Sequence, residues 1–220
     1  MRKQARQKQL PFLKGWGGRR KGSGRKLQNA RPSVPHRARV ELGKPAPLHV
    51  NVRLKDGLPS LRRGPEHQTL RRVLSRCRER KSFRVVHYVI LFNHVHFIVE
   101  GARREDIARG MGGLLTSLAR QLNKLWGGRK GKVFDGRYHD HVLGSPTETR
   151  NALAYVLENA RRHGVWLPKG RPDPYSSGQF FTGWSNYRGT PAVPAWLAAA
   201  NTWLLRSGWT RAGPLKLAFA

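Results

Sequence analysis

Two histidines in one extended segment could form half of a metal site. His94 and His96 are separated by one residue in the run NHVHFIVE, residues 93–100. Because side chains alternate between the faces of a strand, both imidazoles point to one side and the apolar residues between them to the other. Paired imidazoles on a rigid strand bind divalent metals. Two ordinary histidines on a polar face would give the same pattern.

A second histidine pair has the same spacing. His139 and His141 flank Asp140 in a segment with a weaker strand pattern. We interpret this pair as a nucleic-acid contact or as part of the surface.

A phenol and an amide follow further along the chain. Tyr155 and Asn159 are four residues apart, so in a helix they share one stripe, which Arg162 continues. A phenol has an ordinary pKa of about 10 and attacks poorly at neutral pH unless a metal-polarised phosphate and nearby cations stabilise the phenolate. The alternative is a tyrosine that only packs in the core or between helices.

Hydrophobic periodicity predicts the elements that carry these side chains. The last helix has Ser145 as its N-cap and Gly164 after its end. The order of elements predicts an α+β fold, a ferredoxin-like antiparallel sheet with helices packed mainly on one face. The predicted segments are a strand at 48–54, a helix at 70–77, a hairpin of strands at 85–91 and 95–100, a helix at 105–126, a strand at 133–143 and a helix at 145–164.

The charge points to a polyanionic partner. The 220 residues include 43 Lys and Arg against 12 Asp and Glu, a formal net charge of +31, and such a field favours nucleic acid or an anionic surface. The longest apolar runs of about five residues are far shorter than the ~20 of a membrane-spanning helix, and no apolar segment of a signal peptide follows the basic N-terminus. Cys77 is the single cysteine, which excludes an intramolecular disulfide framework and indicates a reducing compartment.

The charge is distributed unevenly along the chain. Residues 1–40 contain thirteen Lys and Arg and no acidic residue, so residues 1–45 are predicted to form a basic disordered arm that contacts phosphates. Residues 46–167 form the predicted compact domain. Residues 168–220 form a C-terminal extension rich in Pro, Gly and Trp, to which the sequence assigns no role.

These motifs together resemble the HUH-type single-tyrosine transposases, specifically the REP-associated tyrosine transposase (RAYT) group. The resemblance covers about residues 46–167 and includes FDGRYH at 134–139 and YVLENARRHG at 155–164. Two residues depart from the pattern. Phe92 stands where many relatives have proline, and Ala160 stands where the tyrosine-helix motif usually has proline after asparagine; neither change removes a functional atom.

The resemblance implies a HUH/Rep-like catalytic domain that nicks and rejoins single-stranded or hairpin DNA through a 5′-phosphotyrosine intermediate. By position, Tyr155 would be the nucleophile, and His94, His96 and Asn159 would bind Mg²⁺ or Mn²⁺. We expect a cytoplasmic, nucleoid-associated protein, monomeric or homodimeric, without a membrane partner. The expected DNA contacts are Arg137, Tyr138, His139, Arg161 and Arg162, with base stacking on Trp126, Phe134, Tyr138 or Trp166.

Two other classes of function fit part of the pattern. A non-catalytic nucleic-acid-binding module, either an inactivated transposase relative or an RNA-binding ferredoxin-like domain, would explain the charge and the fold equally well. A metal-dependent nuclease with a water nucleophile would keep the histidines and tolerate the loss of Tyr155.

Overall fold

A computed structural model describes residues 39–78 and 82–218 of the chain, so residues 1–38 of the predicted arm lie outside the described residues. No helix in the described part is long and apolar enough to cross a membrane. The helices and strands are, in order, β1 (Ala46–Arg53), α1 (Gly64–Arg78), β2 (Phe83–Ile90), β3 (His94–Gly101), α2 (Arg104–Leu125), β4 (His139–Val142), α3 (Pro146–Leu157), α4 (Asn159–Arg162) and α5 (Trp203–Arg206), with short 3₁₀ turns at Gly178–Phe180 and Gly208–Ala212.

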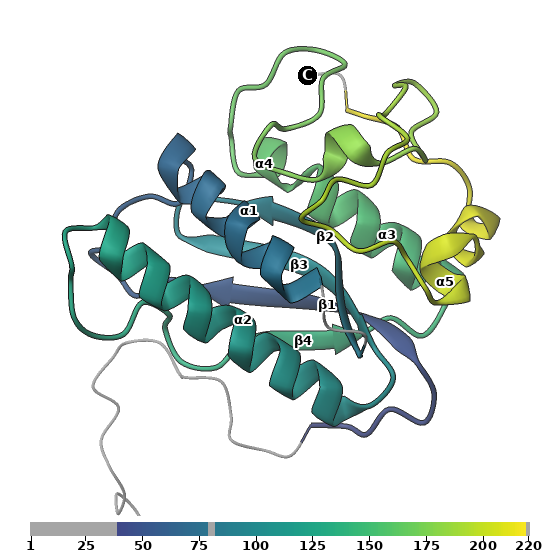
Figure 1. Cartoon of the computed structure of the whole chain (residues 1–220). Helices are drawn as coiled ribbons and strands as arrows, with labels where there is room; N and C mark the ends of the chain where they lie inside the picture. Colours follow the sequence, from purple (N-terminus) through teal and green to yellow (C-terminus); the bar gives the residue numbers. More distant parts are fainter. Residues whose placement is uncertain (1–38, 79–81, 219–220) are drawn as a thin grey trace, which may run out of the picture. The chain divides into compact units, whose positions relative to one another are not determined.

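The four strands form one antiparallel sheet in the order β2-β3-β1-β4. This arrangement confirms the predicted α+β class, a ferredoxin-like antiparallel sheet with packed helices (Figure 1). The last strand is shorter than the predicted 133–143. Gly136 has a φ of 72°, which an extended strand does not allow, so regular pairing begins only at His139.

One face of the sheet carries α1 and α2, which lie side by side across it (Figure 1). The alternating pattern of β1 supplies Leu48, Val50 and Val52 to this core, and the apolar stripes of both helices cover them. The main core therefore lies on the side of the sheet away from the paired histidines of β3.

The other face carries α3 and much of the C-terminal segment, residues 168–218, which also reaches the main core through Tyr175, Trp196 and Leu197. The sequence indicated helices mainly on one face, but Leu153 and Val156 of α3 pack on Val89 and Ile98 from the opposite side. Because the side chains of β3 alternate, His94 and His96 point to this same side. The helix that carries Tyr155 therefore packs on the face that carries the histidine pair.

The predicted helix from Ser145 to Gly164 is two helices. Its beginning is as expected, since Ser145 Oγ accepts a hydrogen bond from Glu148 N at 3.2 Å and Pro146 is the first helical residue. At Glu158 the backbone turns to φ −105° and ψ 7°, which ends α3 before α4 starts at Asn159. Tyr155 and Asn159 thus lie on successive helices.

The C-terminal segment is attached to the sheet through buried polar contacts. The carboxylate of Glu100 in β3 accepts hydrogen bonds from Asn201 N at 2.7 Å and from Thr202 N at 2.8 Å. The guanidinium of Arg150 in α3 donates to the carbonyl oxygens of Gly213 and Pro214. These contacts hold the segment against α3 and the sheet.

His87 of β2 makes the stability of this packing depend on pH. Its Nδ1 lies 3.1 Å from Ser177 Oγ, and burial lowers its pKa from 6.5 to about 4. Between these two values the unfolded chain binds a proton that the folded protein does not. The free energy of unfolding therefore falls as the pH is lowered from 6.5 to 4, by up to about 3 kcal/mol from this residue. We expect urea unfolding of His87→Gln to depend less steeply on pH in this range, with exposed His139→Gln as the control; equal pH dependence in His87→Gln and wild type would contradict this.

Candidate functional site

The site is built on the two imidazoles of β3. His94 and His96 lie on the same face, with ring centroids 5.0 Å apart. His94, the first residue of β3, is half-buried, whereas His96 is buried with 2% of its surface exposed. Nδ1 of His94 lies 2.9 Å from Asn93 Oδ1, which leaves its Nε2 available to a ligand.

Tyr155 lies against His96. Its ring meets the His96 ring edge-on, with the centroids 5.3 Å apart. The guanidinium carbon of exposed Arg162 is 5.8 Å from the Tyr155 ring centroid. A phenol, an imidazole and a cation thus meet at one place on the sheet.

Asn159 follows Tyr155 and is completely buried. It is the first residue of α4, and the ring of His163, at the other end of α4, lies 5.1 Å from the ring of His94. Asn159 therefore lies in the chain between Tyr155, which contacts His96, and His163, which contacts His94.

Four buried polar atoms of Asn51, His96 and Asn159 have no hydrogen-bond partner within the described part of the chain. They are Oδ1 of Asn51, Nε2 of His96 and both amide atoms of Asn159. An unpaired buried polar atom costs about 1–3 kcal/mol, and such atoms occur where a ligand or ion completes the set. The site therefore has donors and acceptors for a group from outside the protein.

The histidines are held in their neutral form. Burial, with smaller contributions from the imidazoles of His49, His94 and His163, lowers the pKa of His96 from 6.5 to about 3. Burial also lowers the pKa of His94 to about 4, with smaller contributions from His163 and Arg53. Neutral imidazoles at neutral pH have the free lone pair that metal coordination needs.

The donor set fits a divalent ion only if an amide takes part. Among residues 39–78 and 82–218, no three His, Cys, Asp or Glu side chains are grouped as ligands of one metal ion. Two imidazole nitrogens and the buried amide oxygen of Asn159 would fill part of a coordination sphere and leave positions for substrate oxygen. The unpartnered atoms of His96 and Asn159 are consistent with this set.

The sequence did not identify His49, which the sheet places in the site. Its Nε2 is 2.9 Å from Nδ1 of His96, and its ring meets that of Tyr155 at 5.6 Å between centroids. The sequence did contain one signal, because His49 and Asn51 alternate with buried residues in the predicted strand at 48–54. To place His49 beside His96, however, one must also know the strand order, in which β1 lies between β3 and β4.

The second histidine pair lies on the same face of the sheet as the first. His139 pairs with Asn51 and His141 with His49 in the β1–β4 register, and both histidines are exposed. The carboxylate of Asp140 between them forms ion pairs with Arg39 and Arg104. A cavity of about 450 Å³ connects this pair with His96 and Tyr155, and it is lined by His49, Asn51, His96, His139, Asp140, His141 and Tyr155.

The remaining predicted DNA contacts differ in accessibility. Arg137 is half-buried, and Tyr138 is buried beneath the guanidinium of Arg39, 3.8 Å from its ring centroid. The side chain of Arg161 is used inside the protein, where its guanidinium donates to three backbone carbonyl groups of the loop after α4. His139 and Arg162 are exposed and lie beside the cavity and the Tyr155 ring, respectively.

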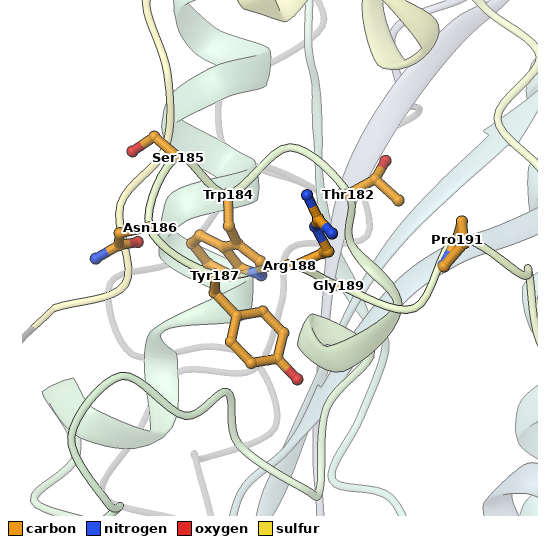
Figure 2. A pocket seen from close by; sticks show the side chains of 8 residues that line it. All are labelled: Thr182, Trp184, Ser185, Asn186, Tyr187, Arg188, Gly189 and Pro191. Atoms are coloured by element: carbon orange, nitrogen blue, oxygen red, sulfur yellow. The ribbon is translucent and has the colours of Figure 1, made fainter.

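A larger cavity, of about 580 Å³, lies in the C-terminal segment (Figure 2). Two of its polar side chains serve the fold: the Asn186 amide hydrogen-bonds to the backbone of Leu217, and the Trp184 indole N–H donates to the carbonyl oxygen of Gly178. Figure 2 shows the Tyr187 hydroxyl pointing away from Ser185 and Asn186. These three polar groups therefore do not point toward one another, as the groups beside Tyr155 do.

Comparison with known proteins supports the fold. No family model and no curated protein sequence matches this chain. Among solved structures, it is similar to a REP-associated tyrosine transposase bound to a REP hairpin, with a TM-score of 0.53 and 18% sequence identity. The match covers 77% of this chain and 94% of the other. At this identity the likeness establishes a shared fold, an antiparallel sheet with packed helices.

Proposed function

We propose that the protein is a metal-dependent, DNA-binding transposase or endonuclease that nicks and rejoins single-stranded or hairpin DNA through a 5′-phosphotyrosine. The observation that carries this proposal is the contact of Tyr155 with His96, 5.3 Å between ring centroids, next to buried polar atoms that have no partner in the described part of the chain. The similar solved structure contains a tyrosine transposase on a DNA hairpin, which supports a DNA substrate.

Tyr155 would supply the attacking oxygen. The phenol gives up its proton, its oxygen forms a bond to the scissile phosphorus, and the bond from phosphorus to the 3′ oxygen breaks. The 3′ oxygen takes up one proton in exchange and leaves as a free hydroxyl. The product is a 5′-phosphotyrosyl linkage, so attack by another 3′-hydroxyl reverses the step and joins strands without a nucleotide cofactor.

The neighbouring residues would hold the phosphate and its charge. His94, His96 and Asn159 would bind Mg²⁺ or Mn²⁺, which when bound draws negative charge from the scissile phosphate. Arg162, beside the Tyr155 ring, would stabilise the phenolate and the developing charge on the phosphate. Because imidazole ligands are softer than Mg²⁺ prefers, we expect Mn²⁺ to bind more tightly.

The charge of the chain supports a nucleic-acid partner. A formal charge of +31 over 220 residues gives affinity for phosphate backbones and strong salt dependence. This field and the reducing compartment indicated by the single cysteine suggest a cytoplasmic, nucleoid-associated protein.

A gel experiment tests the proposal. Single-stranded hairpin DNA labelled on the 3′ side of the cleavage position is incubated with full-length protein and Mn²⁺, then separated under denaturing conditions. We expect a labelled band at the mass of protein plus DNA that resists denaturant. Cleaved DNA without such a band would indicate a water nucleophile, and binding without cleavage would indicate a non-catalytic binding module.

Two exposed aromatic residues are close in sequence to histidines of the site. Phe92, two residues before His94, is 53% exposed, and Trp166, three residues after His163, is 84% exposed. Their chain neighbours pack together, since Leu91 lies in one cluster with residues 165 and 167. The other expected stacking residues, Trp126, Phe134 and Tyr138, are half-buried or buried.

Trp166 is therefore the expected stacking platform for an unpaired base. We expect Trp166→Ala to weaken binding of a hairpin with a single-stranded extension about 5- to 150-fold, corresponding to ~1–3 kcal/mol per stacked base. The slope of log affinity against log salt should not change, since no charge is removed. Titrations at several salt concentrations measure both quantities. Trp203→Ala is the matched control, because Trp203 of α5 is also exposed, at 50%. Equal effects of the two substitutions on DNA affinity would contradict a stacking role of Trp166.

A further inference from the structure

His49 makes the hydrogen bond that fixes His96. Its Nε2 lies 2.9 Å from His96 Nδ1, and the two rings stack with centroids 5.0 Å apart and an interplanar angle of 24°. His49 comes from β1, where the residue paired directly with His96 is Asn51. The contact is thus a diagonal pair across neighbouring strands.

This bond determines which nitrogen of His96 is available. Only one nitrogen of a neutral imidazole carries a proton. If Nδ1 of His96 donates to His49, Nε2 keeps its lone pair, and Nε2 is the buried atom with no partner in the described part of the chain. His94 has the same arrangement, since its Nδ1 faces Asn93 Oδ1 at 2.9 Å. Both imidazoles are therefore held through Nδ1, with Nε2 left for a ligand.

We infer that His49 is a positioning residue, which holds His96 in the tautomer and orientation that present Nε2 to a divalent cation. This inference rests on the proposed function. His49 also borders the nucleophile, because its ring meets the Tyr155 ring at 69° with centroids 5.6 Å apart. Partners that orient metal-binding histidines typically change metal affinity 10- to 100-fold when they are removed.

Mn²⁺ binding to the full-length protein tests this inference without reference to activity. Free Mn²⁺ is followed by its electron paramagnetic resonance signal in wild type, His49→Ala, His49→Gln and His96→Ala. We expect His49→Ala to weaken Mn²⁺ binding about 10- to 100-fold. His49→Gln should recover most of the affinity, because its amide oxygen can accept the same hydrogen bond. His87→Gln, which changes a half-buried histidine under the C-terminal segment, should bind Mn²⁺ as wild type does.

The variants separate two kinds of failure. If His96→Ala loses Mn²⁺ affinity and His49→Ala keeps it, the role of His49 is wrong and the proposed metal site stands. If His96→Ala keeps full affinity, the proposed site itself is wrong. Equal losses in folded His49→Gln and His49→Ala would also overturn the inference, since the hydrogen bond would then not be the cause.

The tautomer can be read in the unmodified protein. Long-range ¹H–¹⁵N spectra of the histidine rings distinguish a proton on Nδ1 from one on Nε2. We expect His96 to be protonated on Nδ1, and a proton on Nε2 would overturn the inference whether or not the His49 variants fold.

Discussion

Replacing Tyr155 with phenylalanine is expected to reduce cleavage of a labelled DNA hairpin by a factor on the order of 10³ or more, and to abolish the covalent adduct. Phenylalanine keeps the ring that meets His96 and His49, so the fold and the DNA affinity should be retained. Single-turnover cleavage in Mn²⁺ and a binding titration on the same hairpin measure the two quantities.

A matched substitution shows whether removing any tyrosine hydroxyl lowers the cleavage rate. Tyr187→Phe changes a tyrosine of the C-terminal segment that lines the larger cavity (Figure 2), and it should cleave at the wild-type rate. Wild-type cleavage by Tyr155→Phe would show that water or another side chain attacks the phosphate.

His96→Ala is expected to have the second largest effect, a loss of cleavage of about a hundred- to a thousand-fold. The substitution removes the buried Nε2 that has no partner in the described part of the chain and leaves His49 without its hydrogen-bonding partner. DNA affinity should change little, because contacts from Lys and Arg to phosphates dominate it. Cleavage rates and binding titrations in Mn²⁺ give both values.

His141→Ala is the comparison within the same sheet face. His141 lines the cavity, but its side chain is 66% exposed and lies 3.7 Å from Glu148, so its removal leaves no buried atom unpaired. We expect less than a tenfold loss of cleavage. The opposite ranking of His96→Ala and His141→Ala would assign the metal to the second histidine pair.

Local pattern was sufficient to predict most of the fold. Alternation in β1 and the i, i+3, i+4 spacing in α2 depend on each segment alone and on one buried face, and both elements lie where they were predicted. The break at Glu158 has no such local signal, since the sequence around it is that of a continuous helix. Its carboxylate instead accepts a hydrogen bond from Ala218 N at 3.1 Å, a contact between distant residues.

The C-terminal segment was not predictable for a related reason. It is held by buried contacts between residues far apart in the chain, such as Glu100 with Thr202 and Trp209 with Phe181. Such contacts have no period in the sequence.

The candidate site was predictable in part. The spacing of His94 and His96 on one strand predicts a shared face, and the contact of His96 with Tyr155 requires only that α3 pack on that face. His49 and His163 could not be included, because their proximity depends on the strand order β2-β3-β1-β4 and on the turn after α4. Strand order follows from packing of the whole sheet and is not visible in any one segment.

The central claim is that Tyr155 becomes covalently attached to a 5′ phosphate. Full-length protein and a hairpin DNA labelled on the 3′ side of the cleavage position are reacted in Mn²⁺, digested with protease and nuclease, and analysed by mass spectrometry. The account predicts a nucleotide on the peptide that contains Tyr155, attached through its 5′ phosphate, with a free 3′-hydroxyl on the other fragment. A cleaved hairpin with no modified peptide, or with the nucleotide on another residue, would contradict it.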